Sequence, residues 1–334
     1  MTREMQIPVV DIRGFREGSP SDRRAVAHEV GSACRSFGFL SIIGHGIEES
    51  LINAVFKANR DFHGLSQERK METLISESAN HRGYHPFAAE STDPDSGPDL
   101  KEAFDMALEL SMDDPDVTAG KNLHGPNVWP QNLPGFREAL TSYYDALVGL
   151  GATLCKCFAI DLGLAEDYFV DKHSKPMAQL RLLHYPELNP STYPNQMGAG
   201  EHTDYGSVAI LAQDQTGGLE VRGPSNQWIP VEPLVGAFVC NLGDMMEIWT
   251  NGLYSATYHR VVHSGSERFS QVLFYDPNYD CRIEPLEACC SPERPPRYAP
   301  VIMGPYLEDL FDTTFAYRKR TKNERAASKS PCDS

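Results

Sequence analysis

Apolar residues recur at three- and four-residue steps in three segments of the first half of the chain, a pattern that predicts amphipathic helices. One begins after Ser19-Pro20, where an N-cap residue precedes proline at the first helical position. Another carries apolar residues on one side from 51 to 62, and the longest, from about 135 to 160, keeps the helical period for more than six turns. A β-rich run at 39–43 separates the first two, and residues 76–100, rich in Ser, Asp, Pro and Gly, are predicted to be a loop.

Short apolar runs separated by turn residues replace this pattern beyond residue 178. Many short strands at close spacing are typical of a β-sandwich or barrel. A final helix is predicted to begin at Gly304 and to pack back on that barrel. The predicted strands are 179–185, 207–212, 219–222, 228–230, 236–241, 247–249, 259–263 and 271–275.

These changes in the pattern of apolar and polar residues divide the chain into four parts. Residues 1–174 form a helical N-terminal region, 175–285 a β-rich core, and 286–317 a C-terminal segment with its helix. Residues 318–334 are charged and polar and are predicted to be disordered.

The charge balance limits the classes of partner. The 334 residues include 46 acidic and 30 basic side chains, a formal charge of −16, and 41% hydrophobic residues. Such a chain is expected to be globular and to repel polyphosphate, so we expect a small-molecule substrate rather than nucleic acid. We also expect no membrane association and a cytoplasmic location, because no apolar run of roughly 20 residues or secretory leader is evident in the sequence. The oligomeric state stays open.

The triplet His202-Thr-Asp204 is the first candidate for chemistry. Residues two apart on a strand share a face, about 6.6 Å apart, so this imidazole and this carboxylate could bind one metal ion. Such triplets are common by chance, and a third ligand is required. His259 is the candidate, because two imidazoles and a carboxylate leave three positions of an octahedral Fe(II) open. Zinc is less favoured, since hydrolytic zinc sites normally carry a helical His-Glu-x-x-His motif, which we do not find.

A second pair, Arg268 and Ser270, is also two residues apart. On a strand, the guanidinium and the hydroxyl would share a face and could clamp a carboxylate by charge-assisted hydrogen bonds. A surface salt bridge is the ordinary alternative for such an arginine. Its position in an apolar strand close to the three candidate metal ligands favours the clamp.

These motifs together resemble the isopenicillin N synthase-like branch of the Fe(II)/2-oxoglutarate-dependent oxygenases, over roughly residues 5 to 315. The resemblance implies a mainly β fold with flanking helices: a distorted double-stranded β-helix, or jelly roll, with an N-terminal α/β region and a C-terminal helix. The motifs that carry it are Ile7-Pro-Val-Val-Asp11, the run from Gly38 to Gly46, Tyr185-Pro186, His202-Thr-Asp204, Gly217-Gly, Asn241-Leu-Gly-Asp244, Asn251-Gly, His259-Arg-Val and Arg268-Phe-Ser270.

The same resemblance assigns roles to residues. His202, Asp204 and His259 match the family's iron ligands. Arg268 and Ser270 match the pair that binds the distal carboxylate of 2-oxoglutarate, and Tyr185 matches a tyrosine that supports that carboxylate. Leu183 stands where many plant members carry asparagine, which leaves that part of the pocket more apolar.

The implied activity is that of a non-haem iron dioxygenase with 2-oxoglutarate and O₂ as cosubstrates. It would oxidise a C–H bond of a small molecule, by hydroxylation, desaturation or cyclisation, with release of succinate and CO₂, and specialised metabolism is the expected setting. Some relatives with this triad act without 2-oxoglutarate, as oxidative cyclases, or fragment it to ethylene. A non-catalytic metal-binding module is a more distant alternative, which the Arg-x-Ser pair disfavours.

Substrate contacts are predicted from two sources. Arg82, Tyr84 and Phe104 lie in stretches that match the family's active-site mouth, although packing explains them equally well. Four residues near the core motifs could face the pocket: Arg181, Leu183, Tyr205 and Phe274.

Overall fold

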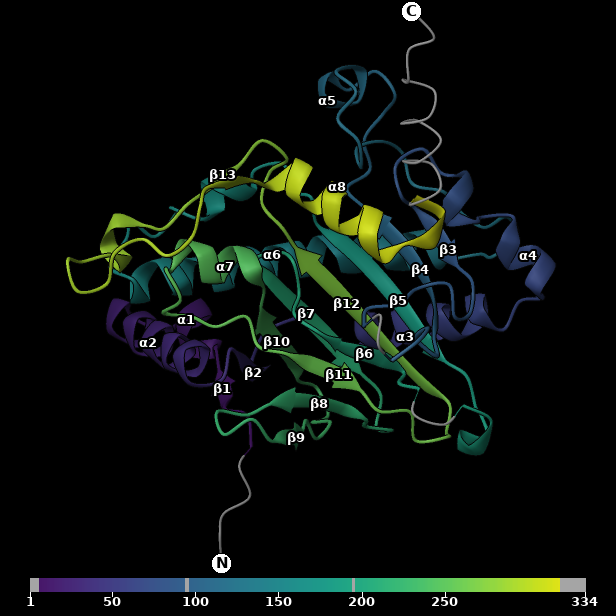
Figure 1. The fold of residues 1–334 in the computed structure, drawn as a ribbon, viewed down its shortest axis with the longest axis horizontal. Helices are drawn as coiled ribbons and strands as arrows, with labels where there is room; N and C mark the ends of the chain where they lie inside the picture. Colours follow the sequence, from purple (N-terminus) through teal and green to yellow (C-terminus); the bar gives the residue numbers. More distant parts are fainter. Residues whose placement is uncertain (1–5, 94–95, 194–195, 319–334) are drawn as a thin grey trace, which may run out of the picture.

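Two β-sheets face each other in the computed structural model, which describes residues 6–93, 96–193 and 196–318 (Figure 1). Helices cover the outer side of the larger sheet, and the C-terminal helix crosses one end of its strands. The tail predicted to be disordered lies, beyond Arg318, outside the described residues.

The larger sheet contains eight strands in the order β1-β2-β10-β7-β12-β5-β4-β3. All its neighbouring strands are antiparallel except β1 and β2, which are parallel. The strands are β1 (Val9–Asp11), β2 (Phe39–Ile43), β3 (Gly83–His85), β4 (Glu102–Ala107), β5 (Gln179–Tyr185), β7 (Val208–Gln213), β10 (Phe238–Leu242) and β12 (Arg268–Tyr275).

The smaller sheet has the order β6-β11-β8-β9 and faces the inner side of the larger one. This arrangement confirms the predicted jelly roll with flanking helices. The strands are β6 (Ala199–His202), β8 (Leu219–Arg222), β9 (Trp228–Pro230) and β11 (His259–Val261), and a separate pair is formed by β13 (Arg282–Ile283) and β14 (Val301–Ile302).

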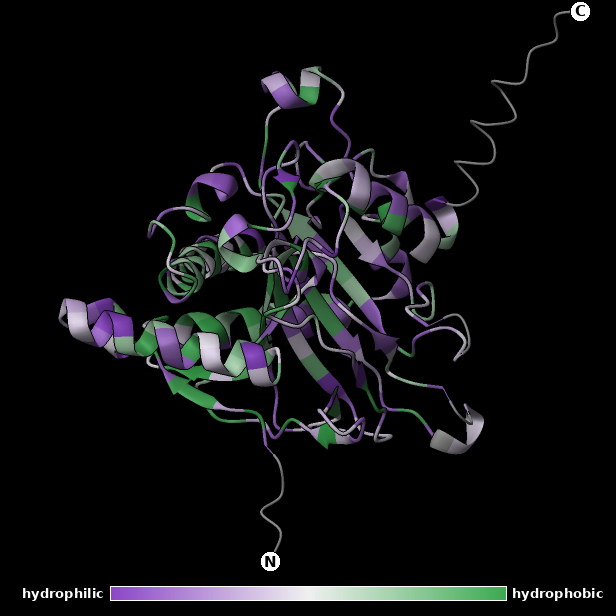
Figure 2. Ribbon diagram, turned by 60° about the vertical axis from the view of Figure 1, so that its left-hand side comes forward, coloured by the Kyte–Doolittle hydropathy of each residue, from purple (hydrophilic) through white to green (hydrophobic). Residues whose placement is uncertain are grey.

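Side chains alternate between two cores along the central strands, because successive residues of a strand point to opposite faces. On β5, Leu180 and Leu182 pack against the helices, whereas Leu183 and Tyr185 belong to the core between the sheets. Figure 2 shows hydrophobic residues along both the large sheet and the helix behind it. The inner faces of β5 and β12 are therefore available to line a site between the sheets.

Eight α-helices lie in the described part of the chain. The Ser19 side chain accepts a hydrogen bond from Asp22 N, and the Asp22 carboxylate accepts one from Ser19 N, a capping box that fixes the predicted start of α2. The helices are α1 (Arg13–Glu17), α2 (Pro20–Ser36), α3 (Glu49–His63), α4 (Gln67–Met71), α5 (Pro115–Thr118), α6 (Phe136–Asp161), α7 (Asp244–Trp249) and α8 (Met303–Thr314). Short 3₁₀ helices cover Ile75–Glu77, Val170–His173, Pro190–Thr192 and Glu287–Cys289.

The long helix α6 confirms the prediction for residues 135–160 and packs on the outer face of the large sheet. Among the described residues it alone has the length and apolar composition of a membrane-spanning helix, and more than half of that stretch is buried inside the fold. The sequence was expected to contain no apolar run long enough to span a membrane, and α6 departs from that expectation by length and composition. The core helix of a soluble protein has the same length and composition.

Two expectations of local structure are wrong. Residues 247–249, predicted as a strand, end helix α7, which begins after Gly243 and buries Met245 and Trp249. A short apolar run fits either element, so periodicity alone could not decide. The loop predicted at 76–100 contains β3, which pairs with the unpredicted strand β4. The sequence did not predict β4 because it contains Glu102 and Asp105, two charged residues that are buried in ion pairs.

Candidate metal and cosubstrate site

A cavity lies between the inner faces of the two sheets, with an empty volume of about 1050 Å³ including the part open to solvent. The inner residues of β5 and β12 form one wall, and residues of β6, β11 and the turn after β6 form the opposite wall. Helix α8 covers one end with Leu307, Phe311 and Thr314, and Tyr205 contacts Thr314 through their hydroxyl groups at 2.9 Å.

His202, Asp204 and His259 converge on this cavity. His202 ends β6 and lies directly opposite His259 on β11. The Nε2 atoms of His202 and His259 lie 3.8 and 3.7 Å from Asp204 Oδ1. The three potential ligand atoms lie within 4.8 Å of one another, close enough to bind one metal ion.

Backbone contacts orient both imidazoles. His202 Nδ1 lies 2.7 Å from the Gly200 carbonyl oxygen, and His259 Nδ1 lies 3.1 Å from that of Thr257. Because a carbonyl only accepts, Nδ1 carries the hydrogen in each ring, and the lone pair of Nε2 points to the shared centre. Burial, followed by the proximity of His202, lowers the pKa of His259, which favours the neutral form that binds metals.

Asp204 is positioned by a turn rather than by the strand, since β6 ends at His202. Asn241 Nδ2 donates a 2.6 Å hydrogen bond to Asp204 Oδ2, which leaves Oδ1 facing the imidazoles. Gly243 allows the turn to approach β10, because a Cβ atom there would lie 2.4 Å from the Gly206 carbonyl oxygen. The sequence places Asn241 in a family motif but does not predict its hydrogen bond to Asp204.

The donor set fits Fe(II). Two neutral imidazoles and one carboxylate on one side of a partly open cavity form the facial arrangement that leaves coordination positions free. A second group, His81, His85 and Asp105, is also compact enough to hold an ion. There, however, both Asp105 oxygens already accept hydrogen bonds from Arg181, and such a cation beside the carboxylate disfavours a metal.

Arg268 lies on β12 opposite Tyr185 on β5, and only 3% of it is exposed. Its guanidinium donates to the Gly217 carbonyl, to Gln213 Oε1 and to Ser270 Oγ, at 2.8, 3.1 and 3.0 Å. It lies 4.8 Å from the centre of the Tyr185 ring. In the described chain none of these partners is a carboxylate, so the buried positive charge is uncompensated and two N–H groups remain for an anionic ligand.

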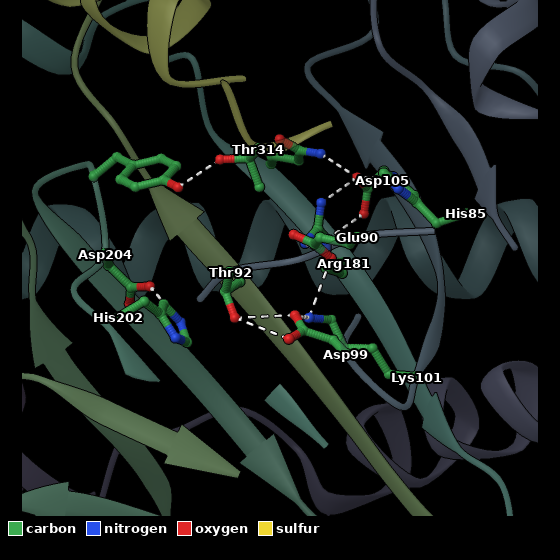
Figure 3. Close-up of polar contacts among 12 residues, drawn as sticks. His85, Glu90, Thr92, Asp99, Lys101, Asp105, Arg181, His202, Asp204 and Thr314 are labelled. Carbon is green, nitrogen blue, oxygen red and sulfur yellow. Dashed lines mark hydrogen bonds and ion pairs between the residues drawn. The ribbon is translucent and has the colours of Figure 1, made fainter. Parts of the chain in front are cut away.

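The other end of the same strands carries Arg181, which is 8% exposed and belongs to a network of buried charges. Its Nε and Nη2 donate to the two oxygens of Asp105 at 2.8 and 2.9 Å, and its Nη1 donates to Glu90. Figure 3 shows this cluster apart from His202 and Asp204. Glu90, Thr92, Lys101 and Gln179 also line the cavity there, and the sequence did not identify any of them as site residues.

Asp276 also lines the cavity and was missed. Its Oδ1 is buried and has no hydrogen-bond partner in the described residues. Burial, with a smaller effect of Asp204, raises the pKa of Asp276 to about 7. A side chain at Gly206 would overlap this carboxylate, which explains the glycine at that turn.

The seven predicted substrate contacts separate into two groups. Arg181, Leu183, Tyr205 and Phe274 line the cavity. Arg82, Tyr84 and Phe104 do not, so the structure does not bring these three to the cavity.

Strand register explains the difference for two of the three. Tyr84 pairs with Phe104, and Phe104 with Leu182, a residue that faces the helices, whereas the next residue, Asp105, pairs with Arg181 on the cavity side. A shift of one residue reverses the face.

Arg82 lies outside the cavity for a different reason. It is buried, and its guanidinium donates hydrogen bonds to the carbonyl oxygens of Asn80, His81 and Leu123. It therefore supports loop structure.

Comparisons with known proteins agree over nearly the whole described chain. Residues 7–132 match the family described as the N-terminal region of non-haem dioxygenases in morphine synthesis, and residues 176–277 match the 2OG-Fe(II) oxygenase superfamily. A probable iron/ascorbate oxidoreductase of Dictyostelium discoideum is 36% identical over 312 residues, which cover 84% of this chain and 85% of the relative.

Two further similar proteins are named or described with 2-oxoglutarate, which is also called alpha-KG. The 2-oxoglutarate-dependent dioxygenase tropC of Talaromyces stipitatus is 37% identical over 294 residues, covering 84% of this chain and 89% of tropC. The crystal structure of a full-length Neurospora crassa protein, in complex with alpha-KG and thymine, is similar with a TM-score of 0.81 and 30% identity, covering 92% of this chain and 97% of that one.

Proposed function

Because the chain belongs to the 2OG-Fe(II) oxygenase superfamily, we propose that His202, Asp204 and His259 hold its Fe(II). The protein is an Fe(II)- and 2-oxoglutarate-dependent dioxygenase, and Arg268 with Ser270 holds the distal carboxylate of 2-oxoglutarate. The observation that carries this proposal is the buried Arg268, whose charge no described carboxylate compensates, in the same cavity as a His₂-carboxylate set.

The cavity residues have separate roles in binding the metal and the cosubstrate. When bound, Fe(II) and 2-oxoglutarate supply O₂ activation and the electrons that it needs, with succinate and CO₂ as by-products. Arg268 donates its free N–H groups to the cosubstrate carboxylate, and the Ser270 hydroxyl can donate a third hydrogen bond. The Tyr185 ring packs against the guanidinium and excludes water from it. Asn241 and the two backbone carbonyls keep the metal-binding atoms aimed at one point.

The reaction on the substrate is oxidation of a C–H bond of a small molecule that occupies the end of the cavity beneath α8. Relatives named as 2-oxoglutarate-dependent dioxygenases favour this over an oxidative cyclase that acts without the keto acid. Arg181, Leu183, Tyr205 and Phe274 are the proposed substrate contacts. The isopenicillin N synthase-like branch, a role in specialised metabolism and a cytoplasmic location stay predictions.

An anaerobic titration tests the proposal. Fe(II) and then 2-oxoglutarate are added to the purified protein, and the weak visible charge-transfer band of the iron–keto-acid chelate is followed. We expect the band in the wild type and a roughly 10- to 100-fold weaker affinity for 2-oxoglutarate in Arg268→Ala, because hydrogen bonds to charged groups contribute about 1.5–3 kcal/mol.

Arg282→Ala is the matched control. Arg282 is exposed and pairs with Glu284 outside the cavity, so the affinity for 2-oxoglutarate should not change. An iron-loaded wild type without the band, or an Arg268→Ala variant that binds 2-oxoglutarate as tightly as Arg282→Ala, would refute the assignment.

A further inference from the structure

Two buried arginines occupy opposite ends of one cavity wall and differ in their charge compensation. Arg268 and Arg181 lie on the inner faces of the paired strands β12 and β5. Arg181 is four residues from Tyr185, the partner of Arg268 across the strand pair, or about 13 Å along β5. Arg268 has only neutral partners among the described residues, whereas Arg181 pairs with two carboxylates.

The carboxylates of this second end outnumber its cations. Asp105 binds Arg181 through both oxygens, and Glu90 binds both Arg181 and Lys101. Lys101 has a further carboxylate partner in Asp99. Burial alone would raise the pKa of Glu90 and of Asp105. Arg181 and Lys101 instead lower the pKa of Glu90 below its ordinary range, and Arg181 and His85 do the same for Asp105. These five groups comprise three carboxylates and two cations, and His85 contacts Asp105 as a further partner.

Hydrogen-bonding capacity nevertheless remains at this end. Arg181 donates four hydrogen bonds to Asp105 and Glu90, which leaves at least one of its five N–H groups for another acceptor. Gln179, two residues earlier on the same face, donates through Nε2 to Asp105 at 2.5 Å, and no described residue donates to its Oε1. A free donor and a free acceptor thus lie on the same face of a strand that lines the cavity.

Aromatic rings flank the same place. The guanidinium carbon of Arg181 lies 6.0 Å from the centre of the Phe274 ring and 5.8 Å from that of Phe315. Phe274 lies directly opposite Gln179, and Phe311 of α8 lines the cavity nearby. A flat ligand can place its faces against these rings while its polar edge points to Arg181 and Gln179.

We propose that the substrate is an uncharged, planar molecule that carries a carbonyl group beside an N–H or O–H group and binds with this edge to Arg181 and Gln179. Arg181 donates to the carbonyl, and Gln179 Oε1 accepts from the N–H or O–H. A carboxylate at the same place would be the third on one guanidinium, whose charge Asp105 and Glu90 already compensate, and is therefore disfavoured. Arg268 has no carboxylate partner among the described residues, whereas Arg181 has two, so the dianionic 2-oxoglutarate binds at the Arg268 end of the cavity. This inference rests on the proposed function, because it takes the Arg268 end as the cosubstrate site.

Two pairs of probes that differ in charge and in the N–H donor test the inference: benzamide with benzoate, and nicotinamide with nicotinate. Each is titrated anaerobically into the Fe(II)- and 2-oxoglutarate-loaded protein, and binding is followed by the change in the visible band and by calorimetry. We expect each amide to bind at least about tenfold more tightly than its acid. Equal or tighter binding of the acids, or no binding of either amide at millimolar concentration, overturns the inference.

Three variants locate the effect. Glu90→Gln removes one carboxylate from Arg181 and should shift the amide-to-acid ratio of affinities toward the acid by about tenfold. Gln179→Leu removes the acceptor and should weaken the amides while leaving the acids unchanged. Glu284→Gln, the same change of charge at an exposed residue outside the cavity, should not alter the ratio.

The outcomes separate this inference from the proposed function. Retention of the 2-oxoglutarate band by Glu90→Gln shows that its cosubstrate end is folded, and an unchanged ratio in that variant then overturns the inference alone. If Glu90→Gln does not fold, Gln179→Leu decides, since unchanged amide affinity overturns the inference. Absence of the band in the wild type refutes the proposed function itself.

Discussion

Replacement of Asn241 by alanine should weaken Fe(II) binding without unfolding the protein. The side chain donates a 2.6 Å hydrogen bond to Asp204 Oδ2, and both residues are buried. A hydrogen bond to a charged group contributes about 1.5–3 kcal/mol, and loss of a residue that orients a metal ligand typically costs 10–100-fold in affinity, or about 1.4–2.7 kcal/mol. The two magnitudes agree, so we expect the dissociation constant for Fe(II) to rise roughly 10- to 100-fold.

The assay is an anaerobic competition titration of Fe(II) between the protein and a coloured chelator, with thermal unfolding measured in parallel. Asn127→Ala is the matched control, because Asn127 is also buried and donates to a carboxylate, Glu109 Oε2 at 3.0 Å, but lies outside the cavity. That variant should lose stability and keep its iron affinity. If Asn241→Ala changes the dissociation constant by less than about threefold, Asn241 does not orient a metal ligand and the geometry of the site has been misread.

Two further predictions concern the two ends of the cavity. Asp105→Asn should lower the free energy of unfolding by about 3–5 kcal/mol, because it breaks a buried ion pair, and for 334 residues this lowers Tm by roughly 4–7 °C. Arg181 holds the pKa of Asp105 below its unfolded value of about 3.9 despite burial. In urea titrations, the difference in the free energy of unfolding between the wild type and Asp105→Asn should therefore be constant from pH 7 to about 4 and shrink below that pH. A difference that shrinks already between pH 7 and 5 would contradict this. Ser270→Ala should raise KM for 2-oxoglutarate about fivefold with little change in kcat, because one hydrogen bond contributes about 1 kcal/mol; an unchanged KM in assays of succinate formation would remove Ser270 from the clamp.

The sequence predicts much of the framework because its elements are periodic or capped. The Ser19 cap, the strand at 39–43 and the apolar repeat of 135–160 each depend on local chemistry, and each is found. The convergence of His202 and Asp204 was also predicted, but for an incomplete reason. The strand ends at His202, and the turn that brings Asp204 back depends on the close approach of Gly243.

The substrate end could not be predicted in the same way, because register and long-range ion pairs determine it. Phe104 was a reasonable candidate beside Asp105, yet pairing with β5 turns Phe104 to the helices and Asp105 to Arg181. Nothing in the spacing of Glu90 and Arg181, which are 91 residues apart, indicates that they bind each other. Asp276 and Asn241 were missed for a related reason: their neighbours in space come from other strands.

The division of the cavity between two kinds of structural element bears on how new specificities arise. The Arg268 end is built from the central strands β5 and β12, each of which is paired with neighbouring strands on both sides. The opposite end combines Arg181 and Gln179 of β5 with lining from α8 and from the segment around Glu90, at the periphery of the fold. Mutations in these peripheral segments can therefore alter the shape of the substrate end, while β5 and β12 keep the residues that bind the cosubstrate and the polar edge of the substrate. Recombination of the α8 segment among homologues is accordingly a direct route to catalysts with altered selectivity.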